Sequence, residues 1–181
     1  MIEIRWHGRG GQGSFTASKL LGASVALYGG RHALAFPSFG PERRGAPVLA
    51  FTKIDDKKIT DRGEIKQCDY IVVLDESLFE ESFLGDLKEK GKIIINTENP
   101  SAYSWYDAEK ITTVDATSIA LEILGKPITN TAMLGALAGV SGIAELASVE
   151  KGMESFFKGT LREKNIRVVE RTFRQSKGAG E

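Results

Sequence analysis

Residues 2–28, IEIRWHGRGGQGSFTASKLLGASVALY, place a short β-type run, a glycine-rich turn and a helical pattern in direct succession. The run 2–6 is rich in β-branched and aromatic residues, as strands are. Five residues after the turn can share one helical face: Leu20, Leu21, Ser24, Val25 and Tyr28. Strand, glycine turn and helix in this order are typical of a phosphate-binding loop in an α/β fold.

The turn has the composition of an anion-binding loop. Gly8, Gly10 and Gly13 fit the G-x-G-x-x-G spacing, and Gly11 and Gln12 complete the turn. Glycines let the backbone turn tightly and approach a ligand closely, and the first amides of the following helix point unpaired N–H groups toward it. An anion is favoured there by these donors and by the helix dipole.

A dinucleotide site would need an acidic residue that is missing here. The next predicted strand is 32–36, HALAF, and an NAD site would have Asp or Glu near its end, about 20 residues past the glycines. The chain instead continues FPSFG over 36–40. This disfavours a free-standing NAD-dependent oxidoreductase.

The composition is that of a single globular domain. The 181 residues are 41% hydrophobic and 27% charged, and 24 Lys and Arg balance 24 Asp and Glu. A net charge of +0 provides no global field for nucleic acid or a membrane surface, so neither is expected as a partner. With neither a signal-like start nor a long apolar run, we expect a cytoplasmic protein, with one domain over 1–174 and a frayed tail over 175–181.

The cysteine count limits metal chemistry. An iron–sulfur cluster normally needs four thiolates and a structural zinc four Cys or His ligands. This chain has one cysteine, Cys68, and two histidines, His7 and His32. We therefore expect no metal site, and any redox centres would lie in other chains.

A second motif lies in the segment 36–48, FPSFGPERRGAPV, which is too rich in Pro and Gly for a helix. Arg43 and Arg44 stand side by side between Pro41 and Pro47. Two interpretations remain open: a solvated turn whose arginines face water, or an anion clamp or subunit contact. The second is suggested because guanidinium forks bind carboxylate and phosphate bidentately.

The rest of the chain alternates strand and helix patterns. Predicted strands cover 46–54 and 58–60 as a hairpin, then 68–75, 92–96 and 111–114. Predicted helices cover 77–90 with Ser77 as its cap, then 116–124, 130–139, 149–158 and 161–174. Together they predict a three-layer α/β/α Rossmann-like domain with a mostly parallel, mixed sheet that includes a β-hairpin.

Several polar residues follow predicted strands or begin helices. Asp75, Asn96 and Thr97 lie at carboxyl ends of strands, where open α/β sheets bind ligands, but capping explains each of them equally well. Asn130 or Thr131 can cap the helix over 130–139, whose start is a second possible anion site.

Two stretches, IRWHGRGGQGS over 4–14 and PSFGPERRGAPV over 37–48, resemble the gamma subunit of 2-oxoacid:ferredoxin oxidoreductases, most closely the pyruvate type. The resemblance implies a complex that oxidises pyruvate with coenzyme A to acetyl-CoA and CO2 and passes electrons to ferredoxin. It also implies that thiamine diphosphate and the iron–sulfur clusters belong to partner subunits, so this chain is an enzyme subunit without activity alone.

In that setting, the loop residues Gly8, Gly10, Gly11, Gln12 and Gly13, with Arg43 and Arg44, are the expected contacts of coenzyme A phosphates. No catalytic residue is expected, and His7 is expected to pack or hydrogen-bond. The alternative is a structural subunit, without a ligand, of a related oxidoreductase for 2-oxoglutarate, 2-oxoisovalerate or indolepyruvate.

Overall fold

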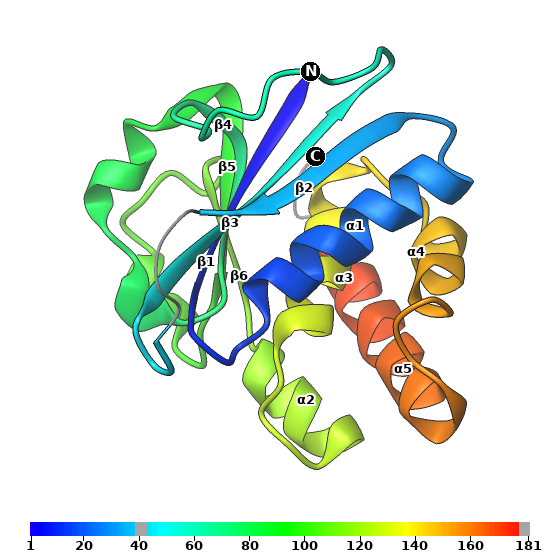
Figure 1. The fold of residues 1–181 in the computed structure, drawn as a ribbon. Helices are drawn as coiled ribbons and strands as arrows, with labels where there is room; N and C mark the ends of the chain where they lie inside the picture. The colour runs from blue at the N-terminus through cyan, green and yellow to red at the C-terminus, as the bar shows by residue number, and fades with distance from the viewer. Residues whose placement is uncertain (39–42, 178–181) are drawn as a thin grey trace.

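A mixed sheet forms the centre of the molecule (Figure 1). The computed structural model describes residues 1–38 and 43–177. Six strands of this part of the chain are ordered β2-β3-β1-β4-β5-β6. Their bounds are β1 (Ile2–Arg9), β2 (His32–Pro37), β3 (Pro47–Asp55), β4 (Cys68–Val73), β5 (Leu87–Asn96) and β6 (Ile111–Val114). β1, β4, β5 and β6 pair in parallel, whereas β3 is antiparallel to β1 and β2. The expected α/β fold with a mixed sheet is confirmed, and the hairpin in this sheet is formed by β2 and β3.

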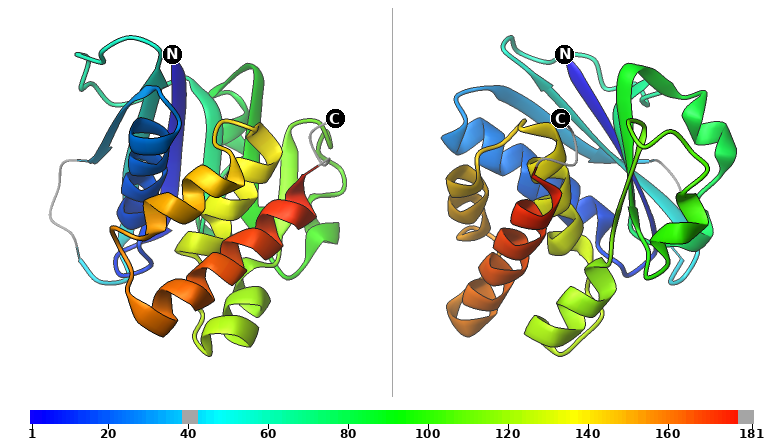
Figure 2. Two further views of the ribbon diagram at one scale, coloured as in Figure 1. Left: turned by 90° about the vertical axis from the view of Figure 1, so that its right-hand side faces the viewer. Right: turned by 180° about the vertical axis from the view of Figure 1, so that it is seen from behind.

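Helices cover one face of this sheet. They are α1 (Ser14–Tyr28), α2 (Ala116–Leu124), α3 (Asn130–Ser141), α4 (Leu146–Met153) and α5 (Gly159–Ser176). Figures 1 and 2 show all five on the same side. The opposite face carries irregular segments and three short 3-10 turns, η1 (Glu76–Leu78), η2 (Glu81–Leu84) and η3 (Pro100–Tyr103). The domain therefore has three layers, but its third layer consists of short turns.

Each face of the sheet has its own hydrophobic core, because successive strand residues point to opposite sides. On the helical face, Ile4 and Trp6 of β1 pack with Leu20 and Leu21 of α1. The Trp6 indole N–H donates to the Thr52 hydroxyl at 3.0 Å, so this buried polar group is satisfied. The second core contains residues of β3, β4 and β5 together with Phe83.

The predicted helix face of α1 is confirmed at four of its five positions. Leu20, Leu21, Ser24 and Val25 are buried. Tyr28, in the last turn, is 42% exposed. The helix ends one residue later at Gly29, beyond which the chain turns into β2.

The predicted hairpin over 46–54 and 58–60 is wrong in its second strand. β3 pairs instead with β2, in a register that places Phe36 opposite Phe51. Their rings lie 5.2 Å apart, and such cross-strand aromatic pairs stabilise an antiparallel register. The arginine motif is thus the connection of this hairpin, of which residues 39–42 lie outside the described part.

The predicted helix over 77–90 is also wrong. The cap is Asp75, whose carboxylate accepts the Ser77 N–H, and only the short turns η1 and η2 follow. From Leu87 the chain already pairs with β4. A Cβ on Gly91 would lie 2.8 Å from the Cys68 carbonyl oxygen, so this glycine permits a close strand approach and does not end a helix.

Two helices near the C-terminus have bounds that differ from the predictions. α4 covers Leu146–Met153, whereas 149–158 was predicted. α5 begins at Gly159 and continues through Ser176, so Gln175 and Ser176 are helical and not part of a frayed tail. The last four residues of the predicted tail, 178–181, lie outside the described part of the chain.

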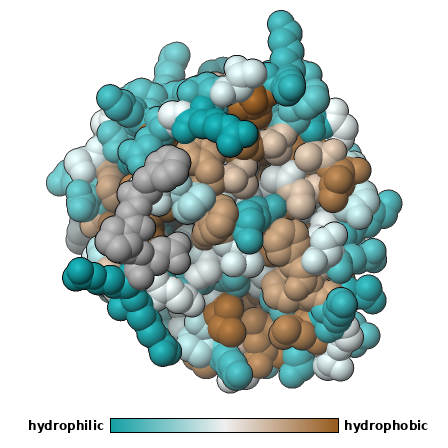
Figure 3. Space-filling view, viewed as in Figure 1, coloured by the Kyte–Doolittle hydropathy of each residue, from teal (hydrophilic) through white to brown (hydrophobic). Residues whose placement is uncertain are grey.

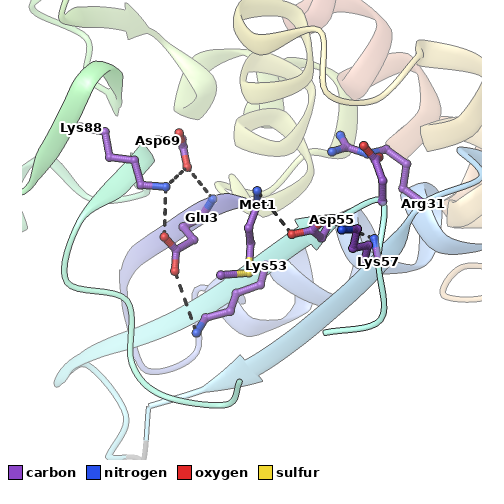
Figure 4. A network of polar contacts seen from close by, with 9 residues as sticks. Met1, Glu3, Arg31, Lys53, Asp55, Lys57, Asp69 and Lys88 are labelled. Atoms are coloured by element: carbon purple, nitrogen blue, oxygen red, sulfur yellow. Dashed lines mark hydrogen bonds and ion pairs between the residues drawn. The ribbon is translucent and has the colours of Figure 1, made fainter. Parts of the chain in front are cut away.

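A network of charged side chains lies at the start of β1, at the opposite end of this strand from the glycine loop (Figure 4). Lys88 contacts Glu3 at 3.0 Å and Asp69 at 2.6 Å. Lys53, only 1% exposed, is paired with Asp61 and lies 4.0 Å from Glu3. A buried ammonium needs such partners because an unpaired one is costly. We therefore assign this network a structural role.

The surface mixes polar and apolar side chains. In Figure 3, hydrophobic residues form small groups separated by hydrophilic ones. Trp105 is the most exposed large apolar side chain of the described residues, at 76%. Isolated exposed apolar residues are normal and do not by themselves mark a site.

Candidate functional site

The glycine loop joins the end of β1 to the start of α1, as the sequence predicts. The Gln12 N–H donates to the Arg9 carbonyl at 2.9 Å and closes the turn. Gly11 and Gly13 have φ values of +98° and +81°, a region that side chains with a Cβ rarely adopt. The backbone conformation by itself therefore favours glycine at positions 11 and 13.

The first turn of α1 is open to a ligand. Its N-cap is Gly13, which offers no side-chain hydrogen bond, and the turn contains no acidic residue. An uncapped helix start presents unpaired N–H groups and the positive end of the dipole. A pocket of about 300 Å³ opens at this point, and its lining is Arg9, Gly10, Gly11, Gly13, Ser14, Phe15, Thr16, Val48 and Leu49.

The arginine segment, residues 43–46 of the arginine motif, is bonded to the glycine loop through its backbone. The Gly10 N–H donates to Ala46 O at 2.8 Å, and the Gly45 N–H donates to Gly10 O at 3.0 Å. Gly10 and Arg44 form an isolated parallel bridge. Two motifs about 30 residues apart in the sequence are therefore one structural unit at the end of the sheet.

The backbone of Arg44 lies next to Gly10, which lines the pocket, but neither Arg43 nor Arg44 is a lining residue. Arg43 and Arg44 are both exposed. Neither guanidinium has a hydrogen bond or ion pair with residues 1–38 or 43–177.

The glycines serve packing as well as access. A Cβ on Gly10 would lie 2.3 Å from the Arg43 carbonyl oxygen, and one on Gly13 would lie 2.6 Å from the Asn130 amide nitrogen. Only Gly11 of these three faces open space within 4 Å. The spacing that predicts ligand approach thus also reflects the docking of the arginine segment and of α3 on the loop.

A polar cluster holds the loop from the side of β4. Asp75 accepts from the Gln12 amide at 2.8 Å and lies 3.2 Å from Arg9 Nε. Burial would raise the pKa of Asp75, but hydrogen bonds from Ser77 and Gln12 and the charge of Arg9 lower it overall. The carboxylate is therefore ionised and acts as an acceptor at neutral pH.

Gln12 is held within the loop by both ends of its side chain. Its side-chain oxygen accepts the Arg9 N–H at 2.7 Å, and its side-chain nitrogen donates to Asp75. Both polar ends of the side chain are thus occupied within the loop. Among the predicted contacts, Gln12 supports the loop and Gly10, Gly11 and Gly13 line the pocket, whereas Gly8, Arg43 and Arg44 do not line it.

His7 packs beneath the loop, as expected. Its Nε2 accepts from Arg5 Nε at 2.9 Å, and its ring lies 4.3 Å from that of Phe83. Burial, reinforced by the charge of Arg5 and opposed by Asp86, lowers the pKa of His7 to about 3. A neutral, buried imidazole committed to Arg5 supports the structure and is not placed as a general base.

The other two strand-end residues, Asn96 and Thr97, bond to neighbouring backbone and side chains. Asn96 accepts the N–H groups of Ala116 and Thr117 at the start of α2 and donates to Leu74 O. Thr97 is bonded to Glu76 and accepts the Asn99 N–H at 3.0 Å. The capping interpretation therefore holds for Asn96, whereas Thr97 stabilises the turn that precedes η3, and neither residue lines the pocket.

Sequence reasoning missed three contributions to the site. Arg9 lies inside the glycine motif, but its role depends on acceptors far along the chain. Val48 and Leu49 form the far wall of the pocket because β3 runs beside β1. The hairpin prediction assigned β3 the wrong partner, which concealed that wall.

Within 1–38 and 43–177, no group of three His, Cys, Asp or Glu side chains is arranged to hold a metal ion. No helix in the same part of the chain is long and apolar enough to cross a bilayer.

Comparisons with known proteins agree along the whole chain. The family described as pyruvate ferredoxin/flavodoxin oxidoreductase matches residues 3–175. Pyruvate synthase subunit PorC of Methanocaldococcus jannaschii is 53% identical over 171 residues, which cover 94% of each chain. The common gamma subunit of the pyruvate/ketoisovalerate oxidoreductases of Thermococcus kodakarensis is 49% identical over 181 residues, 97% of each chain.

The crystal structure of pyruvate oxidoreductase subunit PORC from Thermotoga maritima is 37% identical and superposes with a TM-score of 0.81, covering 96% of this chain and 95% of that one. This chain therefore belongs to the pyruvate ferredoxin/flavodoxin oxidoreductase family, as its gamma-type subunit.

Proposed function

We propose that this subunit binds the phosphates of coenzyme A at the glycine loop, within a complex that converts pyruvate and coenzyme A to acetyl-CoA and CO2 and reduces ferredoxin. The observation that carries the proposal is the uncapped start of α1, which opens on a pocket beside Arg43 and Arg44. The chain as a whole has no net charge, so attraction of an anion must be local.

The site suits the chemistry of coenzyme A. A diphosphate can accept the first-turn amides of α1, and a separate 3′-phosphate can be held by the guanidinium forks. The pocket of about 300 Å³ lies at the small end of ligand pockets, which range from roughly 300 to 1,000 Å³. It accommodates a phosphate-bearing part of coenzyme A, and the rest of the molecule extends toward a partner subunit.

This subunit would contribute binding and orientation. Holding coenzyme A at one end places its thiol near the catalytic centre of a neighbouring subunit and removes a bimolecular encounter. Thiamine diphosphate and iron–sulfur clusters, carried by partner subunits, would supply the decarboxylation and electron-transfer chemistry. The residues of this chain then affect the affinity for coenzyme A more than the turnover number.

The test is the double variant Arg43→Ala/Arg44→Ala, purified in the assembled complex. We expect the KM for coenzyme A to rise about tenfold, the loss expected for a charge-assisted contact, with kcat and the KM for pyruvate unchanged. Arg62→Ala, which removes an exposed arginine from another loop, is the control and should leave all three constants unchanged.

Dephospho-coenzyme A, which lacks the 3′-phosphate, sharpens the test. If the arginines bind that phosphate, wild type and double variant should show the same KM for this analogue. An unchanged KM for coenzyme A in a fully assembled variant complex would contradict the proposal. Loss of copurifying subunits, with a normal KM in the complex that remains, would favour the structural-subunit alternative.

A further inference from the structure

The guanidinium of Arg9 joins three segments that meet at the site. Its Nη1 donates to Gly45 O at 3.0 Å, in the arginine segment. Its Nη2 donates to the Ser77 hydroxyl at 2.8 Å, after β4. Its Nε lies 3.2 Å from Asp75 Oδ2. Arg9 itself belongs to the glycine motif, so one side chain fixes the distance between the glycine loop and the arginine segment.

The two carboxylate oxygens of Asp75 bind different partners. Oδ1 accepts the N–H of Ser77 at 3.1 Å and its hydroxyl, which caps η1. Oδ2 accepts the Gln12 amide at 2.8 Å and faces Arg9 Nε. Capping a three-residue turn requires only the first oxygen. The second oxygen is committed entirely to the glycine loop, which a capping role does not explain.

We infer that Asp75 is a positioning residue for the coenzyme A site: through Arg9 and Gln12 it sets the glycine loop against the segment that carries Arg43 and Arg44. This inference rests on the proposed function. Asp75 does not line the pocket, so it acts through the residues that it holds.

The inference predicts which substitution is disruptive. In Asp75→Asn, one oxygen becomes an amide nitrogen that donates hydrogen bonds. If the remaining oxygen stays with Ser77, the new donor faces the donors of Gln12 and Arg9, and the contact becomes repulsive. Asp75→Glu keeps two acceptor oxygens and the charge, so it should restore part of the effect.

The experiment compares these variants in the assembled complex. For Asp75→Asn we expect the KM for coenzyme A to rise about tenfold, while kcat and the KM for pyruvate stay unchanged. Asp75→Glu should fall between this variant and wild type. Asp115→Asn is the matched control, because Asp115 also follows a strand and caps a helix, by accepting the Ser118 N–H at 2.8 Å, but contacts neither motif.

Hydrogen exchange in the same complexes supplies a readout that does not depend on coenzyme A. The N–H groups of Gly10, Gly45 and Ala46 bond the glycine loop to the arginine segment or close that segment. In Asp75→Asn these amides should exchange faster, whereas amides of β4 and β5 keep their protection. Unchanged exchange at these three amides would overturn the inference.

The outcomes separate this inference from the proposed function. If the double arginine variant raises the KM for coenzyme A but Asp75→Asn does not, the proposed function holds and the positioning role of Asp75 is wrong. If neither variant changes that KM, both are wrong. If Asp75→Asn changes kcat and both KM values together and Asp75→Glu restores nothing, Asp75 has a general structural role and the inference is overturned.

Discussion

At the residue scale, burial determines the protonation state of His7, which directly precedes the glycine loop. The imidazole is 8% exposed and accepts from Arg5, so a proton on it would be both desolvated and repelled. The folded protein therefore keeps His7 neutral down to a pKa of about 3, whereas the unfolded chain protonates it near 6.5.

This difference predicts a pH dependence of stability. Between about pH 6.5 and 3 the unfolded chain binds a proton that the folded chain does not, so the contribution of His7 is complete above pH 6.5 and is lost as the pH falls. In urea titrations from pH 7 to 4.5, the free energy of unfolding should fall less steeply in His7→Gln, by up to about 1.4 kcal/mol per pH unit. The exposed His32→Gln is the control, and an identical slope in His7→Gln and wild type would contradict the prediction.

The glycines of the loop should differ in their tolerance of alanine. In Gly10→Ala the new methyl group meets the backbone oxygen of Arg43 at 2.3 Å, so the arginine segment must move. We expect a loss of about 2–3 kcal/mol in unfolding free energy, within the range for overpacking. Gly11→Ala meets no atom within 4 Å and should lose only about 1–2 kcal/mol, through its φ of +98°. Chemical denaturation of both variants measures these losses. A larger loss of unfolding free energy in Gly11→Ala than in Gly10→Ala would contradict the prediction.

At the element scale, the contact of α3 with α5 depends on two glycines. A Cβ on Gly135 would lie 2.2 Å from the Thr172 hydroxyl and 2.6 Å from Val169 O, and one on Gly139 would lie 2.5 Å from Phe173 O. The run of small residues in α3 thus lets the backbone of α3 approach that of α5 within the same chain. The small residues at helical spacing in α3 favour close packing, but the sequence does not identify α5 as the neighbour.

Gly135→Ala should therefore destabilise the protein by about 1–3 kcal/mol, as overpacked cores do. Adding Thr172→Ala removes one clash but not the contact with the backbone oxygen of Val169, so the double variant should not recover. Gly22→Ala in α1 is the matched control: its Cβ would lie 3.5 Å from the Ala35 side chain, and the change should stabilise by up to about 1 kcal/mol. Thermal unfolding measures all three, and full recovery in the double variant would show that the side chain alone restricts this position.

The elements predicted correctly are those with strong local signals. β4, β6 and α2 were located from apolar runs and from the glycine that ends the helix. The errors arose where tertiary pairing outweighed a local pattern. The Ser77 and Glu80 pair looks like a capping box, but pairing of Leu87 with Cys68 draws the chain into β5. Likewise, Pro and Gly in the connection concealed the pairing of β2 with β3.

At the scale of the whole molecule, the sequence was sufficient for the family and the α/β architecture, since two motifs and the strand and helix patterns agree with the relatives. It could not predict that all five helices described here lie on one face, because periodicity does not say which side of a sheet a helix covers. For the site, the glycine loop and the adjacent arginines were predicted together. The Arg9–Asp75 contact was not, because its partners are 66 residues apart in sequence and meet only in the folded sheet.

The hydrogen bonds that attach the arginine segment to Gly10 are main-chain bonds. The position of this segment therefore does not depend on the side chains at 43 and 44. Exchanging the side chain at position 43 or 44 removes none of these N–H or carbonyl groups, provided that the new residue is not proline. Substitutions at these two positions can therefore change the surface charge at this edge of the sheet while the free energy of folding stays nearly constant.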